Sequence, residues 1–182
     1  MTAIIALHAA GVGSATAAQR LVDVREVPTD TLRDIAIATY EHGRPIIYYN
    51  PILMQRVGPN LADFFMAHEY GHVAHGHAGA ALTLGGDDVG TLRQQQELEA
   101  DCYATATLAE RNGAAVVAAL RFFNRLGPFR FDNLHPTGAQ RAAKILACLP
   151  PGVELPQAAL DASALPITWH IPAAAPAPPI RQ

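Results

Sequence analysis

The sequence predicts an α+β fold that is mainly helical, with a small sheet preceding the central helix. Its 182 residues, half of them apolar and 16% charged, are sufficient for one packed domain of ordinary size. Residues 46–50 (IIYYN) form a β-branched and aromatic run that is typical of a strand. Further along the chain, several segments with helical patterning end at glycine or proline. We therefore expect one domain over residues 19–165.

Both ends of the chain are predicted to lie outside this domain. Residues 3–12 are small and apolar and precede an A-x-A pattern, so residues 1–18 are a candidate signal peptide. An ordinary N-terminal strand or helix is the alternative. Residues 166–182 are rich in alanine and proline, as in an extended tail. Export would place the protein in the periplasm or outside the cell, and a cytoplasmic location is the alternative.

The N-terminal part of the domain is predicted to contain a helix and then a strand. Thr29 or Asp30 can cap a helix over residues 32–41. The strand at 46–50 should stop at Pro51 or lie at a sheet edge, because proline cannot donate to a sheet ladder. An edge strand here could bind an extended peptide by β-augmentation. A plain core strand is an equally open interpretation.

The central helix is expected to begin near Asn60, which is a suitable N-cap. Leu61 and Phe64 start its apolar stripe, and His68 and His72 continue along the same stripe by the i, i+3/i+4 rule. The two histidines therefore lie where the core-facing stripe becomes polar, which suits a half-buried site.

Three further helices are predicted downstream. They cover residues 91–112, residues 114–126 and a last segment that Thr137 caps and that continues to about residue 149.

Composition excludes several classes of protein. The net charge is −3 and no basic cluster occurs, which argues against nucleic acid as a partner. No apolar run approaches the roughly 18–20 residues of a transmembrane helix. Cys102 and Cys148 lack C-x-x-C spacing, so a thiolate zinc site is not indicated. They can form one intrachain disulfide in an oxidising compartment, or remain two buried thiols.

The stretch with the clearest chemistry is HEYGH at residues 68–72, an H-E-x-x-H motif. On a helix its histidines, His68 and His72, lie one turn apart on one face and can share a zinc ion. Glu69 projects beside them and can act as a general base. The alternative is a surface helix that carries these residues by chance and has no metal site.

A hydrolytic zinc site usually has a third protein ligand. His75 lies about 10 Å along the helix axis from His68, by the rise of about 1.5 Å per residue. His75 and His77 are therefore expected to support or border the site. Glu97 and Asp101 form an E-x-x-x-D pair on one face of the next helix. We expect Glu97 to bind the metal and Asp101 to accept the N–H of a ligand histidine.

HEYGH followed by ELEADCYA resembles the gluzincin metallopeptidases, in particular soluble minimal members of the HtpX/CAAX-protease-like branch. His135-Pro136 and Arg141 follow in the order found in that branch. The resemblance covers about residues 46–146 and implies a zincin-like fold. The sequence shows no counterpart of the transmembrane helices of that branch's integral members, so membrane-protein substrates are not implied.

The resemblance also implies roles for individual residues. The implied zinc ligands are His68, His72 and Glu97, with Asp101 behind them. Glu69 would deprotonate the attacking water. His135 is the first candidate for an oxyanion donor and Arg141 the second. Alternatively, His135 caps the following helix and Arg141 pairs with a carboxylate.

The function we expect is zinc-dependent endopeptidase activity on peptides or unfolded proteins. The alternative is a catalytically silent zinc-binding module of the same fold, with a chaperone-like or regulatory role. Loss of the base or of a ligand would indicate the silent module, yet Glu69 and the three implied ligands are present.

Overall fold

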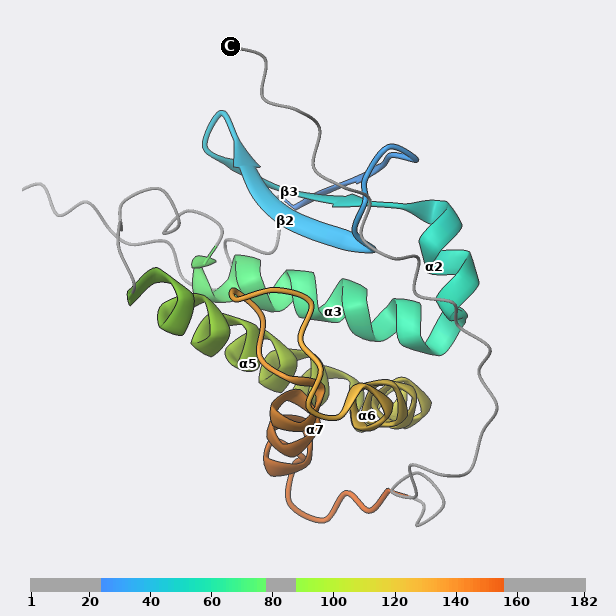
Figure 1. The fold of residues 1–182 in the computed structure, drawn as a ribbon. Helices are drawn as coiled ribbons and strands as arrows, with labels where there is room; N and C mark the ends of the chain where they lie inside the picture. The colour runs from blue at the N-terminus through green and yellow to red at the C-terminus, as the bar shows by residue number, and fades with distance from the viewer. Residues whose placement is uncertain (1–23, 78–87, 156–182) are drawn as a thin grey trace, which may run out of the picture.

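The computed structural model describes residues 24–77 and 88–155. Over these residues the chain forms a mixed α+β fold of one three-stranded sheet and five helices, as the predicted class requires. The sheet lies on one side of the central helix, and the later helices lie on its other side (Figure 1). In this described part, no helix is both long and apolar enough to cross a membrane. The predicted signal peptide (1–18) and tail (166–182) lie outside the described residues.

The sheet consists of β1 (Arg25–Pro28), β2 (Ala36–Glu41) and β3 (Arg44–Tyr49) in the order β1-β3-β2. β1 pairs with β3 in parallel, and β2 pairs with β3 as an antiparallel hairpin. His42 and Gly43 join the hairpin with φ values of 50° and 78°. Positive φ at both central residues is what a type I′ hairpin turn requires, which explains the tight connection.

One prediction for this region is wrong. Residues 32–41 do not form a helix, because most of this segment is β2. The β-branched Ile37 and Thr39 suit a strand, and the hairpin turn brings the segment against β3. The strand predicted at 46–50 forms as β3 and ends before Pro51, as expected. β3 is the central strand of the sheet, so of the two open interpretations the core strand is confirmed and the edge strand is not. The strand with a free edge on the α3 side is β2.

A short helix not predicted from sequence, α2 (Pro51–Val57), follows β3 directly. The Asn50 side chain caps α2 by accepting from the backbone N–H groups of Ile52 and Leu53 at 2.9 and 3.1 Å. The central helix α3 (Pro59–His75) then starts at Pro59. The N-cap predicted at Asn60 is therefore wrong. Proline suits the first helical position because its missing N–H would have no partner there.

The remaining helices are α5 (Asp88–Leu108), α6 (Gly113–Leu126) and α7 (Gly138–Ala147). They correspond to the three predicted downstream helices with shifted ends. The Thr137 hydroxyl accepts from the Gln140 N–H in a capping box, so the predicted cap of the last helix is confirmed.

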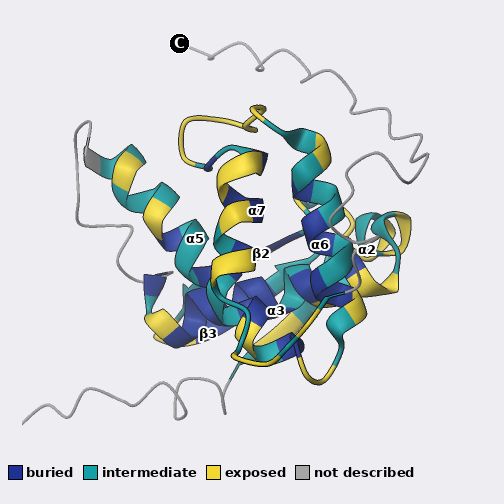
Figure 2. Ribbon diagram, turned by 90° about the horizontal axis from the view of Figure 1, so that it is seen from below, coloured by how far each residue is buried: buried dark blue, intermediate teal, exposed yellow. Residues whose placement is uncertain are grey.

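The main core lies where α3, α5, α6 and α7 meet, and the buried positions cluster on their facing sides (Figure 2). Its largest fully buried apolar side chains are Phe64, Phe123, Leu120, Ile145 and Val116. Of the two alternatives for Cys102 and Cys148, the disulfide is the one present, with the two Cα atoms 5.2 Å apart. It ties α5 to the residue that ends α7, and these two helices carry Asp101 and Arg141.

Gly71 allows α3 and α5 to lie in close contact beside the motif histidines. A Cβ atom at this position would lie 2.9 Å from the Ala100 Cα and 3.0 Å from the Tyr103 Cβ. Gly71→Ala is therefore expected to lower the free energy of unfolding by about 1–3 kcal/mol through overpacking, as measured by urea denaturation. Gly113→Ala is the matched control, because a Cβ there meets no atom within 4 Å. Equal stability of the two variants would contradict the close contact.

Candidate active site

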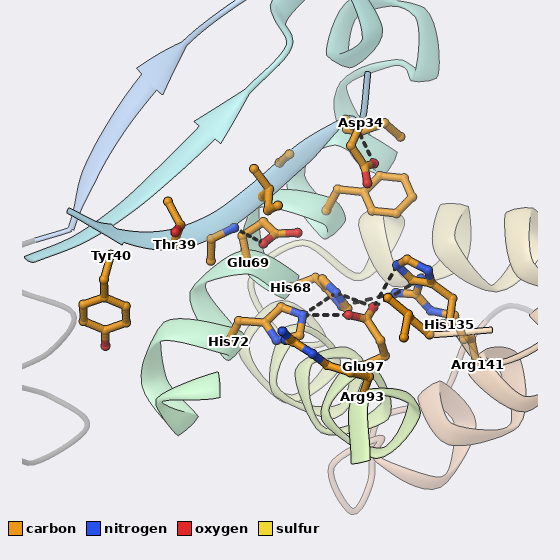
Figure 3. A pocket seen from close by; sticks show the side chains of 16 residues that line it. Asp34, Thr39, Tyr40, His68, Glu69, His72, Arg93, Glu97, His135 and Arg141 are labelled. Carbon is orange, nitrogen blue, oxygen red and sulfur yellow. Dashed lines mark hydrogen bonds and ion pairs between the residues drawn. The ribbon is translucent and has the colours of Figure 1, made fainter. Parts of the chain in front are cut away.

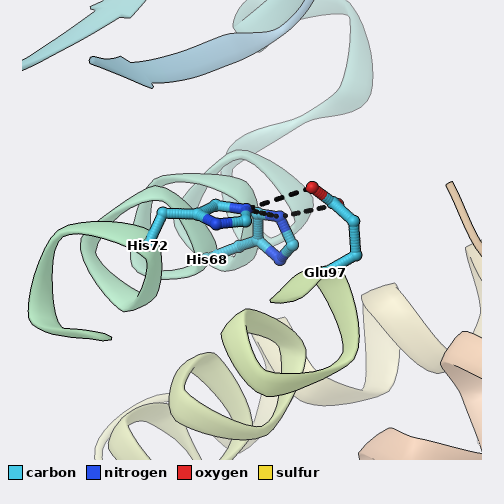
Figure 4. A group of neighbouring side chains, drawn as sticks. All are labelled: His68, His72 and Glu97. Atoms are coloured by element: carbon cyan, nitrogen blue, oxygen red, sulfur yellow. Dashed lines mark hydrogen bonds and ion pairs between the residues drawn. The ribbon is translucent and has the colours of Figure 1, made fainter. Parts of the chain in front are cut away.

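Two helices bring three of the predicted residues together in one cluster. His68 and His72 come from α3 and Glu97 from α5 (Figure 4). The two Nε2 atoms are 3.1 Å apart. Glu97 places Oε2 3.2 Å from the His68 Nε2 and Oε1 3.2 Å from the His72 Nε2. These are the only three groups among residues 24–77 and 88–155 that converge like metal ligands.

The donor set of this cluster fits a zinc ion. A tetrahedral ion with bonds of about 2.0 Å separates its donor atoms by about 3.3 Å. The three observed separations of 3.1–3.2 Å are close to this value. Two imidazole nitrogens and one carboxylate suit zinc, and three protein ligands leave a fourth position for water or substrate. Both histidines are buried, so little solvent competes for the donors.

The charges around the cluster favour a cation. Burial alone would lower the pKa of His68, but Glu97 and Asp101 outweigh it and raise that pKa to about 10. Burial alone would raise the pKa of Glu97, but His68, His72 and Arg141 hold it well below its usual range. Ionised carboxylates therefore lie around the position where a cation would bind, and they stabilise its positive charge.

Asp101 lies directly behind His68, as the i, i+4 spacing to Glu97 predicts. Its Oδ1 is 3.0 Å from the His68 Nδ1, and the side chain is fully buried. Arg141 from α7 donates to both Asp101 oxygens, through Nε at 2.7 Å and Nη2 at 2.6 Å. The third group of Arg141, Nη1, lies 3.9 Å from the Glu97 Oε2. Asp101 thus fixes the orientation of His68, and Arg141 in turn holds Asp101.

Glu69 lies between α3 and the free edge of β2 (Figure 3). The Ala38 backbone N–H donates to the Glu69 Oε2 at 2.6 Å. Glu69 is buried, and this burial raises its pKa above the usual carboxyl value despite the opposing effect of His68 and His72. A carboxylate with a raised pKa is better able to accept and return a proton near neutral pH.

His135 reaches the same cavity from the segment between α6 and α7. Its Nδ1 donates to the Asp132 Oδ1 at 2.8 Å, and its Nε2 lies 4.0 Å from the Glu97 Oε2. The structure thus brings both His135 and Arg141 to the cluster. The role of either residue as an oxyanion donor stays a prediction.

A cavity of about 450 Å³ opens in front of the cluster. One wall is formed by residues 34–40, which include most of β2, and α3 and α5 contribute His68, Glu69, His72, Arg93 and Glu97 (Figure 3). The β2 wall of the cavity could not be expected from a segment, residues 32–41, whose pattern indicated a helix. Two β-rich runs flanking His42-Gly43 were the available signal of a hairpin.

His77, which was expected to support or border the site, contacts His72 directly, whereas its partner Glu99 was not predicted. The His77 Nδ1 is 3.1 Å from the His72 Nδ1, and the His77 Nε2 is 3.0 Å from the Glu99 Oε2. Burial, followed by the nearby His72, lowers the pKa of His77 to about 4, so its imidazole is neutral at neutral pH. His77 supports the cluster from behind and does not join His68, His72 and Glu97.

Comparison with known families gives the class of the protein, which is a peptidase. The family model of Peptidase U49 matches residues 60–154, from the second residue of α3 to beyond the end of α7, and this chain belongs to that family. No curated protein and no solved structure matches the chain. The narrower resemblance to the HtpX/CAAX-protease-like branch stays a prediction.

Proposed function

We propose that this peptidase is a zinc-dependent endopeptidase with a zincin-like fold, and that it hydrolyses peptide bonds in peptides or unfolded proteins. The observation that carries the proposal is the convergence of the His68, His72 and Glu97 donor atoms, with separations of 3.1–3.2 Å, beside the Glu69 carboxylate. All four side chains line one cavity.

Each residue of the cluster has a distinct task. His68, His72 and Glu97 would hold the zinc ion. When bound, zinc supplies a Lewis acid that polarises a peptide carbonyl and lowers the pKa of water to about 7. Glu69 takes the proton from the attacking water and delivers it to the leaving amine. The N–H from Ala38 keeps the Glu69 carboxylate oriented during both transfers.

His135 and Arg141 are the candidate donors to the developing oxyanion. Because the Asp132 carboxylate accepts from the His135 Nδ1, His135 can donate through Nε2 only as an imidazolium. Arg141 already uses Nε and Nη2 for Asp101, which leaves Nη1 as its group nearest the cavity.

An extended substrate is proposed to lie along the free edge of β2. The N–H of Ala38 faces away from β3 toward Glu69. Since backbone groups alternate along an antiparallel strand, those of Ala36 and Tyr40 face the same side. A peptide can pair with them by β-augmentation. Peptide binding by β-augmentation, which was considered for the strand at residues 46–50, is therefore proposed for β2 instead.

Removal of zinc is expected to abolish cleavage of an unfolded protein such as casein. The test is to measure metal content by inductively coupled plasma mass spectrometry, treat the enzyme with 1,10-phenanthroline and add zinc back. We expect one zinc per chain and full recovery on addition of zinc. The non-chelating isomer 1,7-phenanthroline is the control. Undiminished cleavage by folded, metal-free protein, or failure of the folded protein to bind zinc, would refute the proposal.

The disulfide Cys102–Cys148 favours an oxidising compartment. This supports export to the periplasm or outside the cell, which stays a prediction.

A further inference from the structure

The end of α3 places a second histidine directly behind the ligand candidate His72. Gly76 ends α3 with a φ of 74°, the left-handed conformation that reverses the chain at a helix C-terminus. The reversal carries His77 back against His72, with 3.1 Å between the two Nδ1 atoms. His77 is only 6% exposed, although it lies just after the helix end.

The hydrogen-bond partners of this pair fit one arrangement of protons. A metal ion at the His72 Nε2 requires the proton of that ring to be on Nδ1. The nearest partner of Nδ1 is the His77 Nδ1, which must then be the acceptor. A neutral imidazole has one N–H, so the proton of His77 is on Nε2 and faces the Glu99 Oε2 at 3.0 Å.

Glu99 is itself held in place for this role. The Gln95 side chain donates to the Glu99 Oε1 at 2.9 Å, so its other oxygen faces His77. His75 stacks on the far side of His77, with ring centroids 5.3 Å apart and planes inclined by 17°. The His77 ring is therefore fixed by a partner at each nitrogen and by a ring on its face.

We propose that His77 and Glu99 position the His72 imidazole for metal binding by fixing its tautomer and its ring orientation. The inference rests on the proposed metal centre. Each of the two ligand histidines would then have its own supporting pair at Nδ1, because Asp101 and Arg141 hold His68 in the same way. Such partners of ligand histidines change metal affinity by about 10–100-fold when they are removed.

The test compares zinc affinities, measured by competition with a chromophoric chelator, for three variants. His77→Ala is expected to weaken zinc binding by about 10–100-fold. His77→Gln should restore most of the affinity, because its amide oxygen can accept from His72 while its NH₂ group donates to Glu99. His42→Gln is the control, since His42 is exposed in the hairpin turn and does not line the cavity. We expect it to leave zinc affinity unchanged.

A second readout is the imidazole tautomer in the zinc-loaded wild-type protein, read from ¹⁵N–¹H correlation spectra. We expect His72 to carry its proton on Nδ1 and His77 on Nε2. The opposite tautomer of His77 overturns the inference even if His77→Ala does not fold. Unchanged zinc affinity in His77→Ala, or an equal loss in His42→Gln, overturns the inference but leaves the metal centre in place. A folded wild-type protein that binds no zinc overturns the metal centre as well.

Discussion

Glu69→Gln is expected to reduce peptide hydrolysis on the order of 10²–10⁴-fold, the usual contribution of a general base, and to leave the zinc content unchanged. Glutamine has the shape of glutamate, and its amide oxygen can still accept from the Ala38 N–H. The substitution therefore removes the proton acceptor while it preserves the contacts of the buried side chain. The loss should appear mainly in kcat, because Glu69 acts on the attacking water and not on the bound peptide.

The measurement is the initial rate of cleavage of a fluorescent casein, at equal zinc occupancy, for the wild type and the variant. Glu110→Gln is the control, since Glu110 is exposed and does not line the cavity. Equal rates for the wild type and Glu69→Gln would contradict the proposed chemistry. Zinc binding without cleavage in the wild type would favour the silent zinc-binding module instead.

The cluster that this prediction tests could be identified from the sequence because its spacing is local. His68 and His72 share a helix face by periodicity alone, and so do Glu97 and Asp101. The sequence did not reveal the distance between the two helices, which depends on the contact of Gly71 with Ala100. The 3.2 Å separations between Glu97 and the histidines require the two helices to lie this close.

The parts that could not be predicted depend on tertiary context. Residues 36–41 contain alanines that tolerate a helix, and the hairpin with β3 decides their conformation. His77 lies five residues after His72, a spacing that does not share a face on a continuous helix. It becomes a partner of His72 only because Gly76 reverses the chain.

Arg141→Met is expected to lower the free energy of unfolding by about 3–5 kcal/mol, because it removes the guanidinium that pairs with a buried carboxylate. Asp101 is fully buried, and Arg141 donates to both of its oxygens. Methionine keeps an apolar chain over Phe123, where the Arg141 guanidinium carbon lies 4.1 Å from the ring centroid. The loss of stability should therefore come mainly from the broken ion pair with Asp101 and only to a small extent from lost packing on Phe123.

Urea denaturation of the metal-free protein measures this effect in the absence of substrate, so a catalytic role of Arg141 cannot contribute to it. Arg111→Met, at an exposed position, is the control and should stay within about 0.5 kcal/mol of the wild type. A similarly small effect for Arg141→Met would show that the pair does not stabilise the fold.

The double variant Asp101→Asn/Arg141→Met separates the two roles considered for Arg141. Neutralising Asp101 removes the buried charge that has lost its guanidinium, so the double variant should recover part of the stability that Arg141→Met loses. If Arg141 also donates to the oxyanion, kcat will stay low although stability returns. Because Asp101→Asn alone alters the partner of His68, its kcat is the reference for the double variant. A double variant with the same kcat as Asp101→Asn would confine Arg141 to holding Asp101.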